Sequence, residues 1–186
     1  MFDADFDEKV RRIAVEQERI YFAAHRAKVA GNEVLREELR DQLVKQDFEQ
    51  RDLLRNAAAR FASLCKVNPR ATDEDKVAQL LQAFSIGAKL VGLWDDAMGN
   101  VAISTRFERK LYKVRNSLYA IGGGRLSALS VFLSDDNPNV QVAAAARLME
   151  LMPERCVPVL KYLGRRDIGS TGRYARRFLP DHCLRC

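Results

Sequence analysis

Apolar residues in the first third of the chain recur at alternating spacings of three and four, which predicts two long helices, over residues 5–30 and 33–66. Gly31 can take the left-handed conformation that ends a helix, and Asn32 can cap the next one. Because the joint between the helices is so short, they must fold back on each other as an antiparallel hairpin. The expected stripe positions are Phe6, Val10, Ile13, Gln17, Ile20, Ala24 and Ala27 on the first helix, and Leu35, Leu39, Leu43, Phe48, Leu53, Leu54, Ala57, Phe61 and Leu64 on the second.

The predicted hairpin has narrow apolar stripes and heavily charged outer faces. These features suit a coiled-coil arm that projects from the protein, and they suit equally a hairpin that packs on the rest of the chain. We expect the hairpin to form a domain of its own over residues 1–67. It is also the candidate element for homo-oligomer formation or for docking a partner.

From residue 68 onward the sequence predicts shorter helices separated by helix-breaking residues. Asn68 and Pro69 interrupt the pattern, and Thr72 can cap a helix whose acidic first turn meets the positive end of the helix dipole. Gly122, the first of three consecutive glycines, is expected to stop a helix that begins near Arg106. No segment has the alternation of apolar and polar residues that indicates a strand. The remaining helices are expected over residues 126–133, 137–149, 153–163 and 171–179.

The segment from Leu129 to Val140, together with the alanine-rich helix that follows it, has the pattern of a HEAT repeat. In this pattern one helix ends near an acidic turn, and the next begins with a capped valine and carries small residues that allow close packing. The predicted fold class is therefore all-α, with a long N-terminal antiparallel helical hairpin followed by a HEAT-like α-α superhelix. The superhelical domain is expected over residues 68–180, and residues 181–186 are expected to form a flexible tail.

The same region resembles a known family. Over roughly residues 77–179 the chain is similar to the bacterial domain of unknown function 2019 family, which implies a small HEAT-like α-superhelix. The family has no established chemistry, and some relatives are encoded near bacterial toxins, which implies an immunity or antagonist role. Gln141 departs from the usual pattern, in which such repeats often carry arginine. Besides the repeat itself, the resemblance rests on Phe84, Ala88, Asp96, Asn100, Phe107-Glu108-Arg109-Lys110-Leu111 and Pro153-Glu154-Arg155.

Composition narrows the class of protein. With 47% hydrophobic and 30% charged residues the chain is typical of globular proteins. The acidic start, MFDADFDEKV, does not resemble a signal peptide, and no stretch approaches the roughly 18 consecutive apolar residues of a membrane span. We therefore expect a cytoplasmic protein with no membrane contact. Its cysteines are then expected to be reduced.

The net charge of +6 is concentrated near the C-terminus: −1 over residues 1–60, +2 over 61–160 and +5 over 161–186. If the fold brings the basic side chains together, they would form a cationic strip able to contact phosphates. The alternative is an ordinary solvated helix face with ion pairs between neighbouring turns. The candidate partner-binding residues are Arg106, Arg109, Lys110, Lys113, Arg165, Arg166, Arg173, Arg176 and Arg177.

Other chemical motifs are weak. Cys183 and Cys186 are spaced as in half of a zinc site, with His182 beside them, but the sequence has no second Cys pair, and Cys65 or Cys156 could complete the site only if the fold brought one of them close. The glycines at 122–124 lack the preceding strand and the Lys-Ser/Thr of a phosphate-binding loop. His25 lies within a predicted helix, and no ordered Ser/His/Asp or Cys/His set is present. We therefore expect no metal, no cofactor and no enzymatic activity.

These observations favour a non-enzymatic protein–protein interaction module, because helical repeats offer broad binding surfaces. Its concrete version is an immunity or adaptor protein, whose partner is another protein such as a toxin or a larger complex. The alternative hypothesis is a nucleic-acid-binding helical-repeat protein that uses the Arg-rich C-terminal region.

Overall fold

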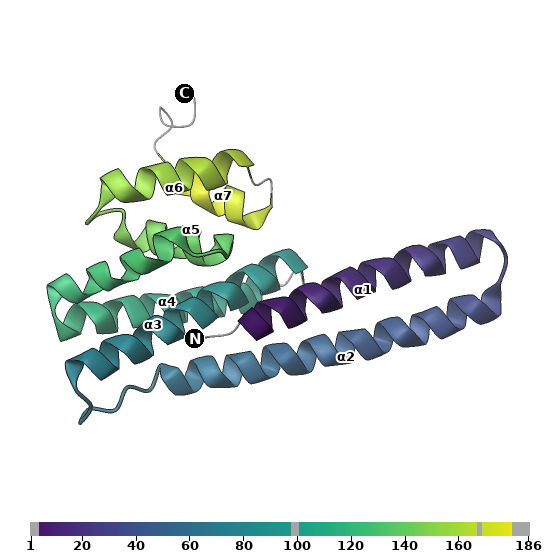
Figure 1. Cartoon of the computed structure of the whole chain (residues 1–186), viewed down its shortest axis with the longest axis horizontal. Helices are drawn as coiled ribbons and strands as arrows, with labels where there is room; N and C mark the ends of the chain where they lie inside the picture. Colours follow the sequence, from purple (N-terminus) through teal and green to yellow (C-terminus); the bar gives the residue numbers. More distant parts are fainter. Residues whose placement is uncertain (1–3, 98–100, 167–168, 180–186) are drawn as a thin grey trace. The chain divides into compact units, whose positions relative to one another are not determined.

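All regular elements of the protein are helices in its computed structural model, which describes residues 4–97, 101–166 and 169–179 (Figure 1). No strand occurs in these ranges, and the all-α prediction is confirmed. The chain divides into two compact units, residues 1–57 and 58–186. This division lies inside a helix, whereas the sequence placed the domain boundary at residue 67.

The first unit contains α1 (Ala4–Val29) and most of α2 (Glu33–Leu64), close to the bounds predicted from the sequence. Between them Gly31 has a φ of 69°, a backbone conformation that only glycine adopts without strain. The side-chain oxygen of Asn32 accepts the backbone N–H of Leu35 at 3.1 Å and caps α2. Both turn residues therefore act as the sequence predicted.

One side of α1 contacts α2. Gln17 donates from Nε2 to Oδ1 of Asp47 at 2.9 Å and to Oε1 of Gln50 at 3.4 Å. The buried positions of α1 recur every seven residues on this same side, and the half-buried positions Val10 and Ala24 lie between them. The predicted α1 stripe is thereby confirmed. Its buried members are Phe6, Ile13, Ile20 and Ala27.

The predicted stripe of α2 is wrong at Phe48, which is exposed, and Leu35 is exposed as well. Phe48 follows the half-buried Leu43 by five residues, and this spacing turns it about 140° around the helix axis. The polar residues Gln46 and Gln50 occupy the shielded positions instead. Spacing of three or four, rather than side-chain hydrophobicity, therefore decides which residues face inward on α2.

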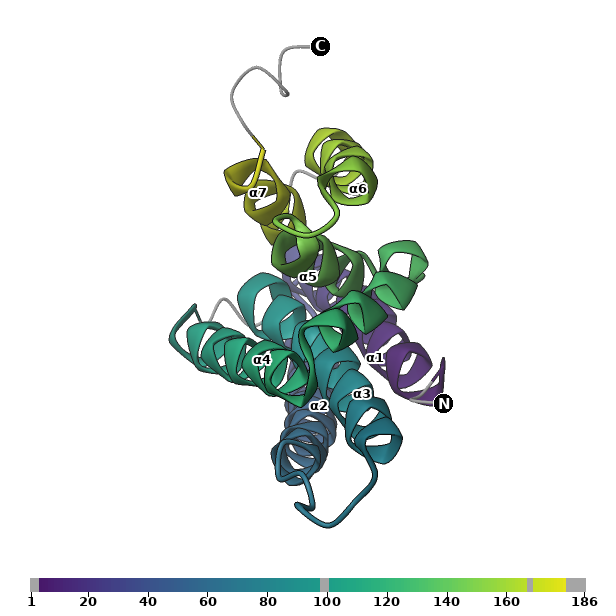
Figure 2. The same ribbon diagram turned by 90° about the vertical axis from the view of Figure 1, so that its left-hand side faces the viewer.

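The second unit consists of helices that pack mainly on their neighbours in the chain. α3 packs along α4, the 3₁₀ segment η2 packs on α4 and α5, α5 packs on α6, and α6 packs on α7 (Figure 2). α5 also contacts α3 and α7. Stacking into a HEAT-like superhelix remains a prediction. The elements are α3 (Asp73–Gly92), η1 (Leu93–Ala97), α4 (Val101–Ile121), η2 (Gly123–Ser134), α5 (Pro138–Leu148), α6 (Pro153–Arg166) and α7 (Ser170–Arg177).

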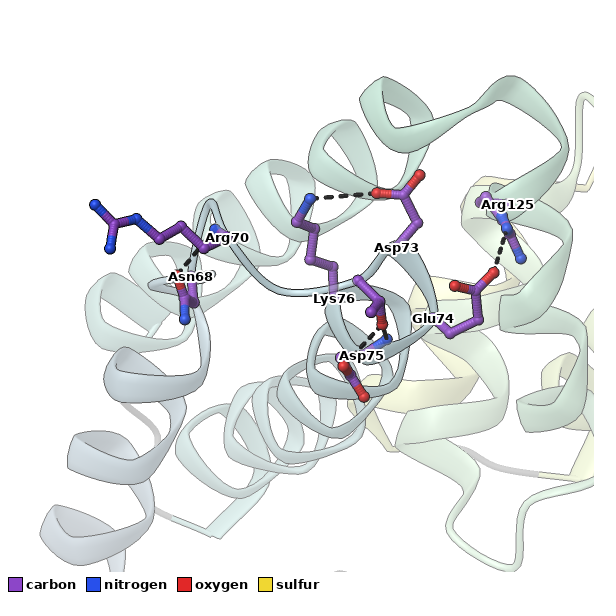
Figure 3. Close-up of polar contacts among 8 residues, drawn as sticks. Asn68, Arg70, Asp73, Glu74, Asp75, Lys76 and Arg125 are labelled. Atoms are coloured by element: carbon purple, nitrogen blue, oxygen red, sulfur yellow. Dashed lines mark hydrogen bonds and ion pairs between the residues drawn. The ribbon is translucent and has the colours of Figure 1, made fainter.

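The start of α3 is fixed by local hydrogen bonds and one longer ion pair (Figure 3). The Thr72 hydroxyl oxygen accepts the backbone N–H of Asp75 at 3.1 Å, which confirms the predicted cap. Arg125, at the start of η2, donates to Glu74 at 2.8 Å and links the two segments. Shorter-range contacts join Arg70 to Asn68 and Lys76 to Asp73.

Two segments differ from the regular α-helices expected. The segment predicted as a helix over residues 126–133 is a longer 3₁₀ helix, in which Leu126, Leu129 and Phe132 share one face because three residues complete a turn. The end of α3 widens into the π-helical turn η1, where the indole nitrogen of Trp94 is buried without a hydrogen-bond partner among the described residues. Such turns are frequent at functional sites.

The last turns of α2 belong to the core of the second unit. Phe61 is fully buried, and its ring centroid lies 5.8 Å from that of Phe107 on α4. A Cβ atom added at Gly87 of α3 would lie 2.8 Å from Cδ2 of Leu111 and from the Phe61 ring. The absence of a side chain at Gly87 thus allows α2, α3 and α4 to converge on Phe61.

Within the described residues, one helical stretch, Asp73–Asp95, is long and apolar enough to pass for a membrane span by length and composition alone. More than half of its most apolar window is buried inside the protein. Packing against α4 and α5 accounts for this apolar character.

Candidate functional site

The predicted basic residues occupy three helices of the second unit. Eight of the nine are exposed, and only Arg176 is half-buried. Their positions fall into a group on α4 and a group on the neighbouring helices α6 and α7. The α4 group is Arg106, Arg109, Lys110 and Lys113; the other group is Arg165, Arg166, Arg173, Arg176 and Arg177.

Lys110 and Lys113 line a cavity of about 240 Å³ together with residues from the end of α2 and from α3. The Lys110 ammonium lies 5.6 Å from the ring centroid of Phe107 and 5.9 Å from that of Phe61, within the range of cation–π attraction. Cys65 lines the same cavity, and burial raises the pKa of its thiol, an effect that the charge of Lys110 partly offsets.

Two basic residues of the second group are already engaged within the protein. Arg166 donates to the hydroxyl of Tyr162, and its guanidinium carbon lies 5.6 Å from that ring. Arg176 donates to the backbone oxygen of Gly164 at 2.5 Å and so ties α7 to α6. These contacts reduce the number of N–H groups that the α6–α7 group presents to a phosphate.

A charged side chain that the sequence analysis did not single out lies buried on α5. Arg147 is only 5% exposed. Its guanidinium carbon lies 4.9 Å from the ring centroid of Tyr112 and 5.7 Å from that of Phe84. Aromatic faces on two neighbouring helices thus stabilise the positive charge in place of water.

Only part of the Arg147 guanidinium is hydrogen-bonded. Nη1 donates to the backbone oxygen of Ala143 at 3.0 Å. Nε and Nη2 are buried and have no hydrogen-bond partner among the described residues. An unpaired buried donor is costly, and more so when it belongs to a charged group.

Polar side chains from α4, α5 and α7 meet next to Arg147. The Tyr174 hydroxyl donates to Oε1 of Glu108 at 2.7 Å, and the Thr171 hydroxyl donates to Oδ1 of Asn139 at 2.6 Å. Burial is the largest cause of a raised pKa at Tyr174, against which the positive charge of Arg147 acts. The phenol therefore stays neutral and remains a hydrogen-bond donor at physiological pH.

These side chains surround a cavity of about 40 Å³, which we call the Arg147 cavity. Its walls are mostly apolar, and polar groups reach it at a few points, as is common in ligand-binding pockets. The polar lining residues are Asp95, Glu108, Asn139, Arg147, Thr171 and Tyr174.

The sequence contained one signal for this site. Arg147 interrupts an alanine-rich helix on a face that is otherwise apolar, between Ala144 and Leu148, both of which are fully buried. A charge at such a position indicates a buried polar group with a specific environment. The partners themselves come from helices far apart in the chain, so no local spacing could have revealed them.

In the part of the chain that the structure describes, no group of three or more His, Cys, Asp or Glu side chains is placed to hold a metal ion. The candidate zinc ligands His182, Cys183 and Cys186 lie outside the described residues, as does the expected tail over 181–186. Comparison with known proteins adds no relative: no family model matches the chain, and no match is found among curated proteins or solved structures.

Proposed function

We propose that the protein is a non-enzymatic protein–protein interaction module that docks a partner on the outer face of α1. The observation that carries this proposal is a row of exposed apolar side chains, Val15, Phe22 and Val29, which are 60%, 52% and 77% exposed. We call them the α1 outer stripe. Large apolar side chains that recur regularly on a surface mark an interaction site more often than scattered ones do.

The geometry of the α1 outer stripe suits a helical partner. Its members are spaced by seven residues, so they lie on one side of the helix, as in a coiled-coil seam. Val15 follows the buried Ile13 by two residues, which turns it about 200° around the axis. α1 therefore carries one apolar stripe toward α2 and a second on its opposite side.

An immunity or adaptor protein is the concrete form of this proposal. The HEAT-like pattern of residues 129–140 supports a scaffold for binding proteins, and the resemblance to the domain of unknown function 2019 family supports an immunity role. The partner is then a toxin or a component of a larger complex in the cytoplasm. A second copy of the chain is the other occupant that the stripe can accept.

Replacing Val15, Phe22 and Val29 together with serine should lower partner binding at least tenfold. The matched control replaces Tyr119, Val131 and Leu151 with serine, since these apolar side chains are also exposed but belong to the second unit. Partners are captured from the native host, with and without nuclease, and identified by mass spectrometry. Light scattering on the purified variants measures self-association.

The two variants should differ in binding while keeping equal helicity by circular dichroism. Loss of a nuclease-resistant partner, or of a homo-oligomer, in the α1 variant alone supports the proposal. Equal binding by wild type and the α1 variant would remove the α1 outer stripe from the functional account.

Nucleic-acid binding is the second candidate function, favoured by the exposure of eight of the nine predicted basic residues. If they contact phosphates, log K for a random duplex should fall with log salt by about 0.9 per contact. Replacing Arg173, Arg177 and Arg165 with glutamine should then flatten this slope by roughly 2–3 units. We expect weak binding and little effect of the substitutions. A steep slope that flattens in the variant would promote this candidate over protein binding.

A further inference from the structure

The cavity beside Lys110 and Lys113, which we call the Lys110 cavity, lies within the second unit between the end of α2, α3 and α4. Its floor is apolar and buried, since Leu80 and Val114 are only 1% and 2% exposed. The two lysines and Ser117 are exposed and form its rim. The Lys110 cavity therefore combines an apolar interior with a positively charged mouth.

The charge of this mouth is not balanced by the side chains around it. Among the described residues no acidic side chain lines the Lys110 cavity, and neither lysine ammonium has an ion-pair or hydrogen-bond partner there. The contact of Lys110 with the rings of Phe61 and Phe107 leaves its N–H donors available to an anion. α4 has a single acidic residue, Glu108, and this side chain lines the Arg147 cavity and accepts a hydrogen bond from Tyr174.

Both lysines lie on the side of α4 that faces the cavity. Cys65 lines the cavity wall, where burial raises the pKa of its thiol and the charge of Lys110 lowers it. Since this attraction weakens with distance, the Lys110 ammonium lies near the thiol. Lys113 follows by three residues and so occupies the same side of the helix. Because lysine side chains are flexible, one anion at the mouth can contact both ammonium groups.

We propose that the Lys110 cavity binds a small amphipathic anion, whose apolar body lies on Leu80 and Val114 and whose charged head group contacts Lys110 and Lys113. The head group is a carboxylate or a phosphate, since ammonium groups bind both. The site goes beyond the proposed function, because it belongs to the second unit and does not involve the α1 outer stripe. Failure of either proposal leaves the other in place.

The volume of the cavity limits the size of this ligand. An apolar cavity of about 150 Å³ is enough to bind benzene. The Lys110 cavity has a volume of about 240 Å³, so a body of that size fits and leaves space for a head group at the mouth. Pockets for drug-sized ligands begin at about 300 Å³, so the ligand is smaller than these. Benzoate is therefore a suitable probe.

The test is a titration of the full-length ¹⁵N-labelled protein with sodium benzoate, followed through the backbone amide shifts. Benzamide, which keeps the ring without the charge, and sodium acetate, which keeps the charge without the ring, are controls at matched ionic strength. We expect saturable shifts at the end of α2 and over residues 110–117. Half-saturation should need about tenfold less benzoate than either control, because each control lacks one of the two interactions. Benzoate binding no tighter than that of benzamide or acetate would overturn the proposal.

Two variants test the rim and the interior separately. Lys113→Met removes one ammonium but keeps an apolar stem, and it should weaken benzoate binding about fivefold, as expected for an exposed charge pair. Ala62 lines the interior, so Ala62→Leu should fill the space and abolish binding without a change of charge. Arg109→Met is the matched control, since Arg109 is an exposed cation on the same helix but does not line the cavity.

Arg109→Met should leave benzoate binding unchanged. Equal losses in Lys113→Met and Arg109→Met would mean that the overall charge of α4, rather than the cavity, attracts the anion, and would contradict the proposal. Undiminished binding by a folded Ala62→Leu variant would place the ligand outside the cavity and contradict it as well. If Ala62→Leu fails to fold, the comparison of Lys113→Met with Arg109→Met decides.

A second titration distinguishes the two head groups. Phenyl phosphate carries the same ring as benzoate with a phosphate in place of the carboxylate, and inorganic phosphate is its control. Tighter binding of phenyl phosphate than of benzoate assigns the site to a phosphate monoester. Equal or tighter binding of benzoate assigns it to a carboxylate. Inorganic phosphate binding as tightly as phenyl phosphate would show that the apolar floor contributes nothing and would contradict the proposal.

Discussion

Replacement of Phe61 by alanine is expected to lower the free energy of unfolding by about 3–5 kcal/mol. Phe61 is 0% exposed, and its ring packs against Phe107, Lys110 and the side of α3 at Gly87, where no side chain intervenes. Truncation deletes a fully buried ring and leaves a cavity, because α2, α3 and α4 cannot move together far enough to fill it. Urea unfolding followed by circular dichroism measures the change.

The same substitution at Phe48 is the control. Phe48 lies on the same helix but is 62% exposed, so Phe48→Ala should change stability by no more than about 0.5 kcal/mol. Equal losses for Phe48→Ala and Phe61→Ala would mean that Phe61 is not the point of convergence described above. A small loss at both positions would mean that the end of α2 does not belong to the core of the second unit.

Gly92→Ala is expected to destabilise the protein by about 1–3 kcal/mol. At an open helical site this substitution would instead stabilise, by up to about 1 kcal/mol, because alanine favours the helix. At Gly92 the added Cβ would lie 2.1 Å from Cγ of Asn139. The Asn139 side chain is held by the Thr171 hydroxyl and cannot move away without losing that hydrogen bond.

Urea unfolding also measures this second prediction, and two further variants sharpen it. At Gly124, an added Cβ would meet no atom within 4 Å, so Gly124→Ala should be neutral or slightly stabilising. In the Asn139→Ala background, Gly92→Ala should lose most of its cost, since the clashing side chain is gone. An undiminished cost in that background would show that the strain lies elsewhere than at Asn139.

Together these substitutions separate two kinds of packing. Phe61 fills space at the junction of three helices, whereas Gly92 leaves space for a polar side chain beside the Arg147 cavity. A protein that tolerates alanine at Gly92 would have an Asn139 that moves freely.

Local chemistry allowed the sequence to predict the helices and their ends. Gly31 ends α1 with a positive φ, Asn32 caps α2, and Thr72 caps α3, each as expected. Such features involve residues within about four positions of one another, so the local sequence alone decides whether they form. The α1 stripe followed from the same kind of local periodicity.

The angular position of a residue around its helix explains the apolar positions that the sequence analysis assigned wrongly or missed. Phe48 has a side chain suited to a core, yet its spacing from Leu43 points it outward. Val15, Phe22 and Val29 form a regular row that the sequence analysis passed over, because the stripe beginning at Phe6 already explained the helix. Each apolar residue has an angular position, and only that position combined with a partner helix decides its burial.

The sequence by itself determined the fold class, the bounds of α1 and α2 and the helices that carry the basic residues, whereas α4 begins at Val101 rather than near Arg106 and η2 is a 3₁₀ helix. Only the tertiary structure decided that Arg147 is buried between two aromatic rings, with one edge unpaired and a cavity beside it. The residues that make this site come from α3, α4, α5 and α7, and their meeting depends on how the helices pack. Capping and periodicity act over a few residues along the chain, whereas the environment of a buried charge is set by side chains that the sequence places far apart.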